Sequence, residues 1–171
     1  SFRKATDGSV KDMRMDAQES ALRYMYFLDQ YTVEMPIGNY NGYMDDTLDN
    51  YVEEMNSVTD FNYYISSYQQ AMEDAFNLFG KYAFRKVTKL FSTSKRYQIN
   101  KLLMLAVLVV LSKNRNSYQE KMGCGICLTP YLADLIENDA DFFRAITWST
   151  NSKWNILYVM NSLKVNVFDK Y

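Results

Sequence analysis

Three groups of residues in this sequence have types and spacing that suit chemistry: a cysteine pair, a row of carboxylates and a basic stretch. The cysteine pair, Cys124-Gly-Ile-Cys127, has the spacing of half a zinc site or of a redox dithiol. A structural zinc ion needs four ligands, and the chain has two cysteines and no histidine. A zinc ion shared across a dimer and a redox role both stay open. We favour ordinary loop cysteines.

Acidic side chains crowd the segment from Asp45 to Glu54. Asp45, Asp49 and Glu53 would share one face of a helix, opposite an apolar stripe. Such a face suits either magnesium binding or plain exposure to solvent, and we favour exposure. The Glu-x-x-His pairs of di-iron helical bundles are absent.

The absence of histidine is the strongest exclusion that the composition makes. It rules out Ser–His–Asp and Cys–His catalysis, histidine-ligated zinc and HNH-type nuclease chemistry within this chain. Neither a P-loop nor a dinucleotide-binding glycine motif is present. The residue types by themselves therefore name no enzyme.

The balance of 19 basic and 20 acidic side chains hides a segregation of charge. Residues 1–74 carry 14 acids and 5 bases, whereas residues 75–119 carry 9 bases and no acid. An acid-free stretch in so acidic a chain is a candidate surface for phosphate, in nucleic acid or a nucleotide, or for a protein partner. The competing interpretation, which we favour from the sequence, is that the acidic first half packs against the basic middle.

The elements that must position these residues are helices. Hydrophobic periodicity predicts an all-α fold, a single domain (1–171) with about six helices in an irregular bundle. The first two predicted helices cover residues 16–31, with an Asp16/Glu19 capping box, and 44–56. The third runs from Thr59 or Asp60 to Gly80, and the central one covers residues 100–113. The last two cover residues 129–147, starting at Thr129-Pro130, and a segment capped by Ser152. The central helix is predicted because Leu102–Leu111 is apolar on every side.

Four other segments are expected to be non-helical or ambiguous. Residues 1–15 are predicted to be an extended N-terminal segment, and 114–127 a polar loop. Lys81–Phe91 fits a helix or a short strand-like passage equally well, and Lys164–Phe168 alternates weakly like a strand.

Several separated motifs resemble one known family. Arg14–Tyr24 (R-M-D-A-Q-E-S-A-L-R-Y) resembles a signature of GmrSD-type restriction proteins, in their ParB/sulfiredoxin-like N-terminal domain family. Tyr40–Asn56 is similar to the "Y-x-G-x-M-x-x-x-L-N-x-F-M" helix of that family. Phe79-Gly80-x-x-Ala83-Phe84-Arg85 with Ile99-Asn100-Lys101, and later Ala145–Thr150, are similar to further family passages in the same order. The resemblance covers about residues 14–163.

The resemblance implies a helical portion that lies apart from the family's active site. In that family a D-G-Q-Q-R motif linked to nucleotide hydrolysis precedes this region, and Asp7-Gly8-Ser9-Val10 does not match it. Because the first residue is Ser1, we expect a fragment of a larger protein. The implied parent is a nucleotide-dependent DNA endonuclease or its nucleotide-hydrolysing part, with NTP and magnesium as its cofactors. This chain is expected to hold no cofactor of its own.

The resemblance and the basic stretch together nominate residues for contact with nucleic acid or phosphate. They are Arg14, Arg23, Arg85, Lys86, Arg96, Asn100 and Lys101. For Arg23 the competing role is an ion pair with Glu19, four residues earlier on the same helix face.

The expected partners are a separate N-terminal catalytic domain, DNA and, in one version, a second copy of the chain. No membrane partner is expected, since the longest apolar run has ten residues, and two cysteines suit a cytoplasmic location. The alternative function is a helical adaptor that binds protein through a tyrosine- and methionine-rich surface, without nucleic acid. A third hypothesis keeps an enzyme in this chain through a carboxylate–metal site on the second helix.

Overall fold

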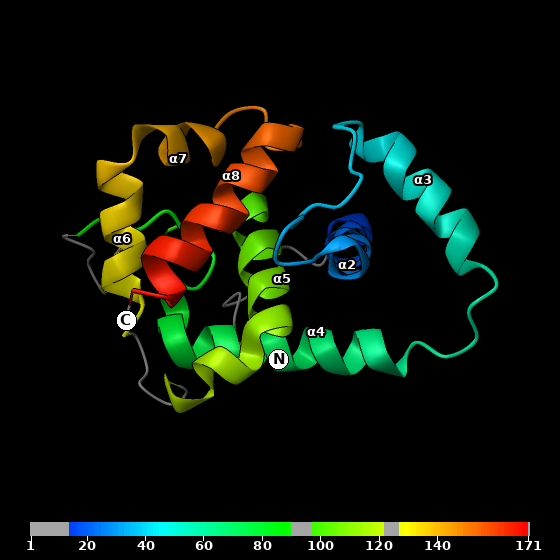
Figure 1. The fold of residues 1–171 in the computed structure, drawn as a ribbon, viewed down its shortest axis with the longest axis horizontal. Helices are drawn as coiled ribbons and strands as arrows, with labels where there is room; N and C mark the ends of the chain where they lie inside the picture. Colours follow the sequence, from blue (N-terminus) through cyan, green and yellow to red (C-terminus); the bar gives the residue numbers. More distant parts are fainter. Residues whose placement is uncertain (1–13, 90–96, 122–126, 171) are drawn as a thin grey trace.

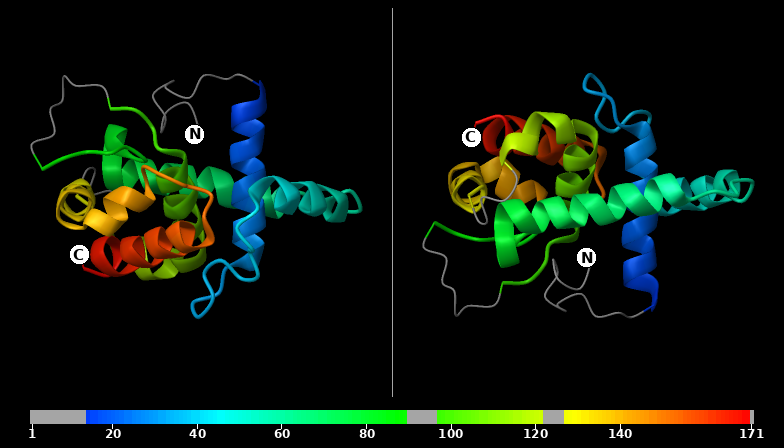
Figure 2. Two further views of the ribbon diagram at one scale, coloured as in Figure 1. Left: turned by 90° about the horizontal axis from the view of Figure 1, so that it is seen from above. Right: turned by 90° about the horizontal axis from the view of Figure 1, so that it is seen from below.

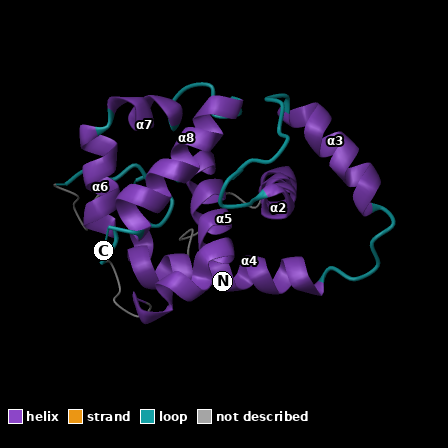
Figure 3. Cartoon of the chain, in the orientation of Figure 1, coloured by secondary structure: helices purple, strands orange, loops and turns teal. Residues whose placement is uncertain are grey.

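The computed structural model describes residues 14–89, 97–121 and 127–170, and this part of the chain is all-α (Figures 1 and 3). The helices are α2 (Arg14–Gln30), α3 (Met44–Met55), α4 (Asn62–Phe79), α5 (Lys101–Tyr118), α6 (Thr129–Asn138), α7 (Ala140–Ala145) and α8 (Lys153–Leu163). Short 3₁₀ turns cover Gly80–Tyr82 and Gln119–Lys121, and a π-helical turn covers Lys164–Phe168. The prediction of an all-α bundle is confirmed.

Helix α5 forms the centre of the fold, as its all-round apolar sequence predicts. All ten residues from Leu102 to Leu111 are buried. Helices α2, α4 and α8 pack against α5, and the views of Figure 2 show them on different sides of it. Asn100 is the N-cap of α5, since its Oδ1 accepts a hydrogen bond from the Leu103 N–H at 2.9 Å. Burial on every side explains why α5 needs no polar face.

A single carboxylate joins the first three helices. Asp29 near the end of α2 accepts hydrogen bonds from the hydroxyls of Tyr51 on α3 and Tyr64 on α4, at 2.6 and 2.9 Å. Helix α3 lies at the outer edge of the molecule in Figure 1 and packs on α2. The two tyrosine hydroxyls thus link α3 and α4 to α2 through directional hydrogen bonds, which apolar packing alone does not provide.

Two predicted helix boundaries are wrong. Helix α2 begins at Arg14 and not at residue 16, so Asp16 lies inside its first turn. The predicted helix 129–147 is divided at Asp139, whose backbone is extended and whose Oδ1 caps α7 by accepting from the Phe142 N–H. Thr129 is buried as the first residue of α6, and its hydroxyl donates to the Phe79 carbonyl at 3.1 Å.

The predicted loop 114–127 is wrong up to residue 121, residues 122–126 lie outside the described part of the chain, and the weak strand-like alternation of Lys164–Phe168 corresponds to no strand. Helix α5 continues to Tyr118 through a kink at Asn114, and the turn Gln119–Lys121 follows it. The Asn114 amide donates to the Val110 carbonyl at 2.9 Å, the acceptor that a regular helix would offer to the Asn114 backbone N–H. Lys164–Phe168 prolongs α8 as a π-helical turn because Val167 and Phe168 are buried against the core. The segment predicted to be extended at residues 1–15 lies outside the described residues up to position 13.

Buried tyrosines give this protein an expected alkaline limit. Burial raises the pKa of Tyr40 and of Tyr68 from 10.0 to about 12, and raises that of Tyr24 further. The unfolded chain therefore loses these protons near pH 10, before the folded chain does. Stability is fully present below pH 10 and is lost as pH rises toward 12.

We expect the urea midpoint to stay level from pH 6 to 9, because the chain has no histidine, and to fall above pH 10. Tyr68→Phe should lessen the alkaline fall, since phenylalanine has no proton to lose. A midpoint that already falls between pH 7 and 9 would contradict this assignment.

Candidate phosphate-binding site

Three of the residues nominated from the sequence line one pocket. Lys86, Asn100 and Lys101 lie around a cavity of about 520 Å³ at the N-terminus of α5. The other lining residues come from the segment that leads into α5 and from the connection between α7 and α8: Tyr97, Gln98, Ile99, Leu102, Ile146, Thr147 and Thr150. The pocket thus joins segments that are about 50 residues apart in sequence.

A buried arginine holds the two segments that carry the lysines. Arg85 is 3% exposed, and its guanidinium donates to the Lys81 carbonyl and the Tyr97 carbonyl. The Asn100 N–H donates to the Phe84 carbonyl at 2.8 Å, and the backbones of Arg85 and Ile99 form an isolated antiparallel β-bridge. The ambiguous passage after Gly80 is therefore neither helix nor strand beyond Tyr82 but an irregular segment fastened to residues 97–100. Arg85 therefore anchors this segment, and its buried guanidinium is not part of the proposed contact surface.

Asn100 positions a second wall of the pocket. Its Oδ1 caps α5, and its Nδ2 donates to the Ile146 carbonyl at 2.5 Å. The cap of α5 is thereby bonded to the residue that precedes Thr147. Both ends of the Asn100 side chain are used in this way, which makes Asn100 a positioning residue for the pocket.

The electrostatics of the pocket favour an anion. Among the described residues, the charged ones that line it are two lysines, Lys86 and Lys101. The Lys86 ammonium donates to the Thr147 hydroxyl at 3.1 Å and lies 5.5 Å from the centre of the Phe143 ring. The N-terminus of α5 adds positive partial charge to the same place. Two ammonium groups suit the binding of a phosphate oxygen; they form no nucleophile–base pair.

The other nominated residues lie elsewhere. The Arg23 guanidinium pairs with Glu19 at 2.5 Å and donates to the Asn151 side chain at 2.7 Å. The competing role foreseen for Arg23 is thus observed, and the bond to Asn151 adds a tie between α2 and the segment before α8. Arg14 is the first residue of α2, and Arg96 lies outside the described residues.

Two cations of the basic stretch, residues 75–119, form ion pairs with carboxylates on different helices. Arg115 pairs with Asp74 on α4 at 2.8 Å, which joins it to the acidic first half. The Lys89 ammonium pairs with Asp134 on α6 at 2.6 Å, which raises the pKa of Lys89 and lowers that of Asp134. The expected packing of the acidic half against the basic middle therefore describes part of the arrangement.

Cys127 and the carboxylate row do not line this pocket. Cys127 is half-buried beside the core and disulfide-bonded, so the prediction of ordinary loop cysteines is wrong for it; Cys124 lies outside the described residues. Asp45, Asp49 and Glu53 are exposed on α3. Within residues 14–89, 97–121 and 127–170, three or more cysteine or carboxylate side chains do not gather in a group that suits a metal ion.

Thr147 and Thr150 are site residues that the sequence reasoning missed. They belong to Ala145–Thr150, which matched the family resemblance only as a closing motif. Two hydroxyl residues three apart near a predicted helix end are too common to point to a ligand. Their role depends on Asn100 bringing that segment to α5.

Comparison of the chain with protein-family models, with curated proteins and with solved structures found no match. Within the described residues, no helix combines the length and the apolar character that crossing a membrane requires. The pocket is therefore interpreted from its own chemistry.

Proposed function

We propose that this chain is a non-catalytic helical module that contacts the phosphates of DNA or of a nucleotide through the pocket of Lys86 and Lys101. The observation that carries the proposal is that Lys86, Asn100 and Lys101, which the sequence nominates independently of the structure, line one cavity without an acidic lining residue. Asn100 shapes the cavity, and the two lysines supply the charge.

The family resemblance extends this proposal to the setting in which the module works. The proposed parent is a GmrSD-type restriction or anti-phage protein of the cytoplasm. A separate D-G-Q-Q-R domain would hydrolyse the nucleotide there, with NTP and magnesium bound in that domain. The helical bundle would then act as a scaffold beside it. Two described contacts fit a scaffold role: the hydrogen bond from Arg23 to Asn151 joins α2 to the segment before α8, and the ion pair of Arg115 with Asp74 joins α5 to α4.

Removing the two pocket lysines tests the phosphate contact. We expect Lys86→Ala/Lys101→Ala to weaken binding of a fluorescent oligonucleotide by about tenfold or more at low salt. The dependence of log K on log salt should become shallower by about 1.4 to 1.8, because two phosphate contacts are lost. Fluorescence anisotropy between 20 and 200 mM salt measures both quantities.

Lys113→Ala is the matched control, since Lys113 is an exposed lysine of α5, the helix that begins at Lys101, and does not line the pocket. We expect it to leave affinity and salt dependence near those of the unmodified chain. Equal losses in the control and the double variant would reject a specific contact at the pocket. Absence of binding by the unmodified chain at 20 mM salt would reject the proposal.

A specific observation favours the adaptor alternative as the second candidate. The first turns of α4 expose Phe61, Tyr63 and Ile65, and Val52 on α3 is also exposed. Such a group of apolar side chains at the outer edge of the molecule suits a protein partner. This candidate gains support if the chain binds no oligonucleotide at low salt, because its surface lies away from the pocket lysines.

A further inference from the structure

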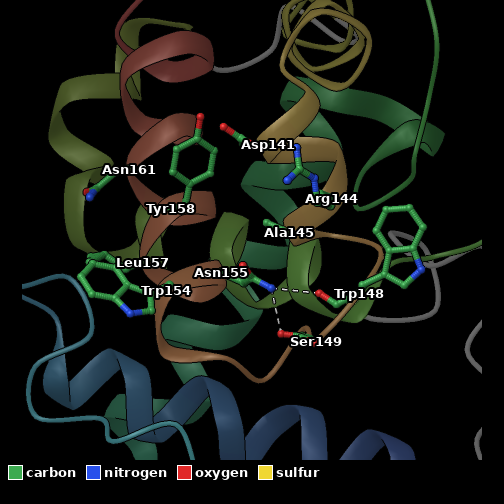
Figure 4. A pocket seen from close by; sticks show the side chains of 10 residues that line it. All are labelled: Asp141, Arg144, Ala145, Trp148, Ser149, Trp154, Asn155, Leu157, Tyr158 and Asn161. Atoms are coloured by element: carbon green, nitrogen blue, oxygen red, sulfur yellow. Dashed lines mark hydrogen bonds and ion pairs between the residues drawn. The ribbon is translucent and has the colours of Figure 1, made fainter.

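A second cavity of about 500 Å³ lies between α7 and α8 and is aromatic (Figure 4). Trp148 and Trp154, the two tryptophans of the chain, line it and are 60% and 74% exposed. Tyr158 lines it from the next turn of α8. Large indole rings with most of their surface in water are unusual in a protein, and they form ready platforms for another flat ring.

The aromatic cavity and the phosphate-binding pocket are lined by neighbouring residues of one segment. Thr147 and Thr150 line the pocket of Lys86 and Lys101, while Trp148 and Ser149 between them line the aromatic cavity. The two sites therefore lie on either side of one four-residue segment. The Phe143 ring lies near one residue of each site: its centre is 5.5 Å from the Lys86 ammonium and 6.3 Å from the centre of the Trp148 ring, in an edge-to-face arrangement.

The backbone beneath the first tryptophan is held in place. The Asn155 amide donates to the carbonyls of Trp148 and Ser149 at 2.9 and 3.0 Å, as the dashed lines in Figure 4 show. The Trp148 N–H donates to the Arg144 carbonyl at 2.9 Å. Ser149 keeps a positive φ of 51°, which the surrounding hydrogen bonds must stabilise. A platform fixed in this way loses little conformational entropy when a ring stacks on it.

The acidic groups near the cavity are already bonded. Asp141 pairs with Arg144 at 2.9 Å, and Asp139 accepts from the Tyr158 hydroxyl at 2.8 Å. The charge of Asp141 is thus partly offset by Arg144, whereas Asp139 keeps its charge and is engaged by the Tyr158 hydroxyl. Proteins that bind single-stranded nucleic acid combine positively charged side chains that contact the phosphates with aromatic rings on which the bases stack.

We propose that the surface formed by Lys86, Lys101, Trp148 and Trp154 binds single-stranded nucleic acid, with bases stacked on the tryptophans. This inference rests on the proposed function and deepens it, because it names the form of nucleic acid that the phosphate pocket would take. A base paired within a duplex offers no free face to stack, so single strands should bind more tightly than duplexes.

Trp148→Ala and Trp154→Ala test the stacking. We expect each to weaken binding of a 16-nucleotide oligo-dT by about 5- to 100-fold, the range for loss of one base–aromatic stack. The salt dependence should stay unchanged, since no phosphate contact is removed. Tyr63→Ala is the control, because Tyr63 is an aromatic residue of α4 that is 56% exposed and lines neither cavity. All three variants should keep the melting temperature of the unmodified chain.

Intrinsic fluorescence supplies an independent readout, because all indole emission comes from the two proposed stacking residues. Oligo-dT should quench this emission in the unmodified chain and in each single Trp→Phe variant, and duplex DNA of equal length should quench less. Unchanged affinity in both Trp→Ala variants, or equal binding of duplex and single strand, would overturn this inference. If the two lysine substitutions still weaken binding in that case, the phosphate contact stands without the stacking. If they too have no effect, the proposed function fails as well.

Discussion

Replacing Leu108 by alanine is expected to lower the free energy of unfolding by about 2 to 5 kcal/mol. Leu108 is 1% exposed in the middle of α5, the helix against which α2, α4 and α8 pack. The loss combines the transfer free energy of the removed carbons with the cavity that a helix held on several sides cannot close. For a chain of this size the melting temperature should fall by roughly 5 to 15 °C.

Ile65→Ala provides the matched control. It is also an aliphatic-to-alanine change in a helix, but Ile65 is 53% exposed on α4. We expect its effect to stay within about 0.5 kcal/mol. Urea denaturation followed by circular dichroism compares the two variants. Similar effects at both positions would mean that α5 is not the centre of the core.

Replacing Arg115 by alanine is expected to cost about 3 kcal/mol, more than a surface ion pair would. The reason lies in its partner: the Asp74 side chain is 3% exposed, and the Arg115 Nε lies 2.8 Å from its Oδ2. After the substitution, Asp74 keeps one hydrogen bond, from the Gln70 amide at 3.0 Å, but has lost its cation. A buried carboxylate without a counter-charge destabilises the folded chain.

Two comparisons isolate this effect. Lys113→Ala removes an exposed cation two residues earlier on α5 and should change stability by about 0.5 kcal/mol or less. The double variant Arg115→Ala/Asp74→Asn should be less destabilised than Arg115→Ala alone, because no charge is left buried. A double variant as unstable as the sum of its single changes would show that the pairing with Asp74 is not what Arg115 contributes.

Much of the helical pattern follows from the sequence because it depends on neighbours. Asn100 and Ser152 begin α5 and α8 as predicted, since an N-cap needs only a short polar side chain and the next three N–H groups. The all-round apolar run after Asn100 is predicted to be central and is central. The break at Asp139 was missed because Asp139 caps a new helix inside a run that keeps helical spacing.

The candidate site divides in the same way. Charge and resemblance selected Lys86, Asn100 and Lys101 from the sequence, and these residues line one pocket. Neither charge nor resemblance distinguishes these residues from Arg85. Arg85 is equally basic and directly precedes Lys86, but it is buried and anchors the backbone. The sequence does not single out Trp148 and Trp154, because the exposure of an indole ring depends on how the helices pack.

The sequence by itself determined the helical class, the central helix and the absence of histidine chemistry, because composition and local periodicity carry that information. Only the tertiary structure decided which cations face solvent. Asn151 binds Arg23 from 128 residues away, and the Asn100 side chain reaches the carbonyl of Ile146, 46 residues along. Contacts of this range depend on how the helices pack, so no short window of sequence contains them.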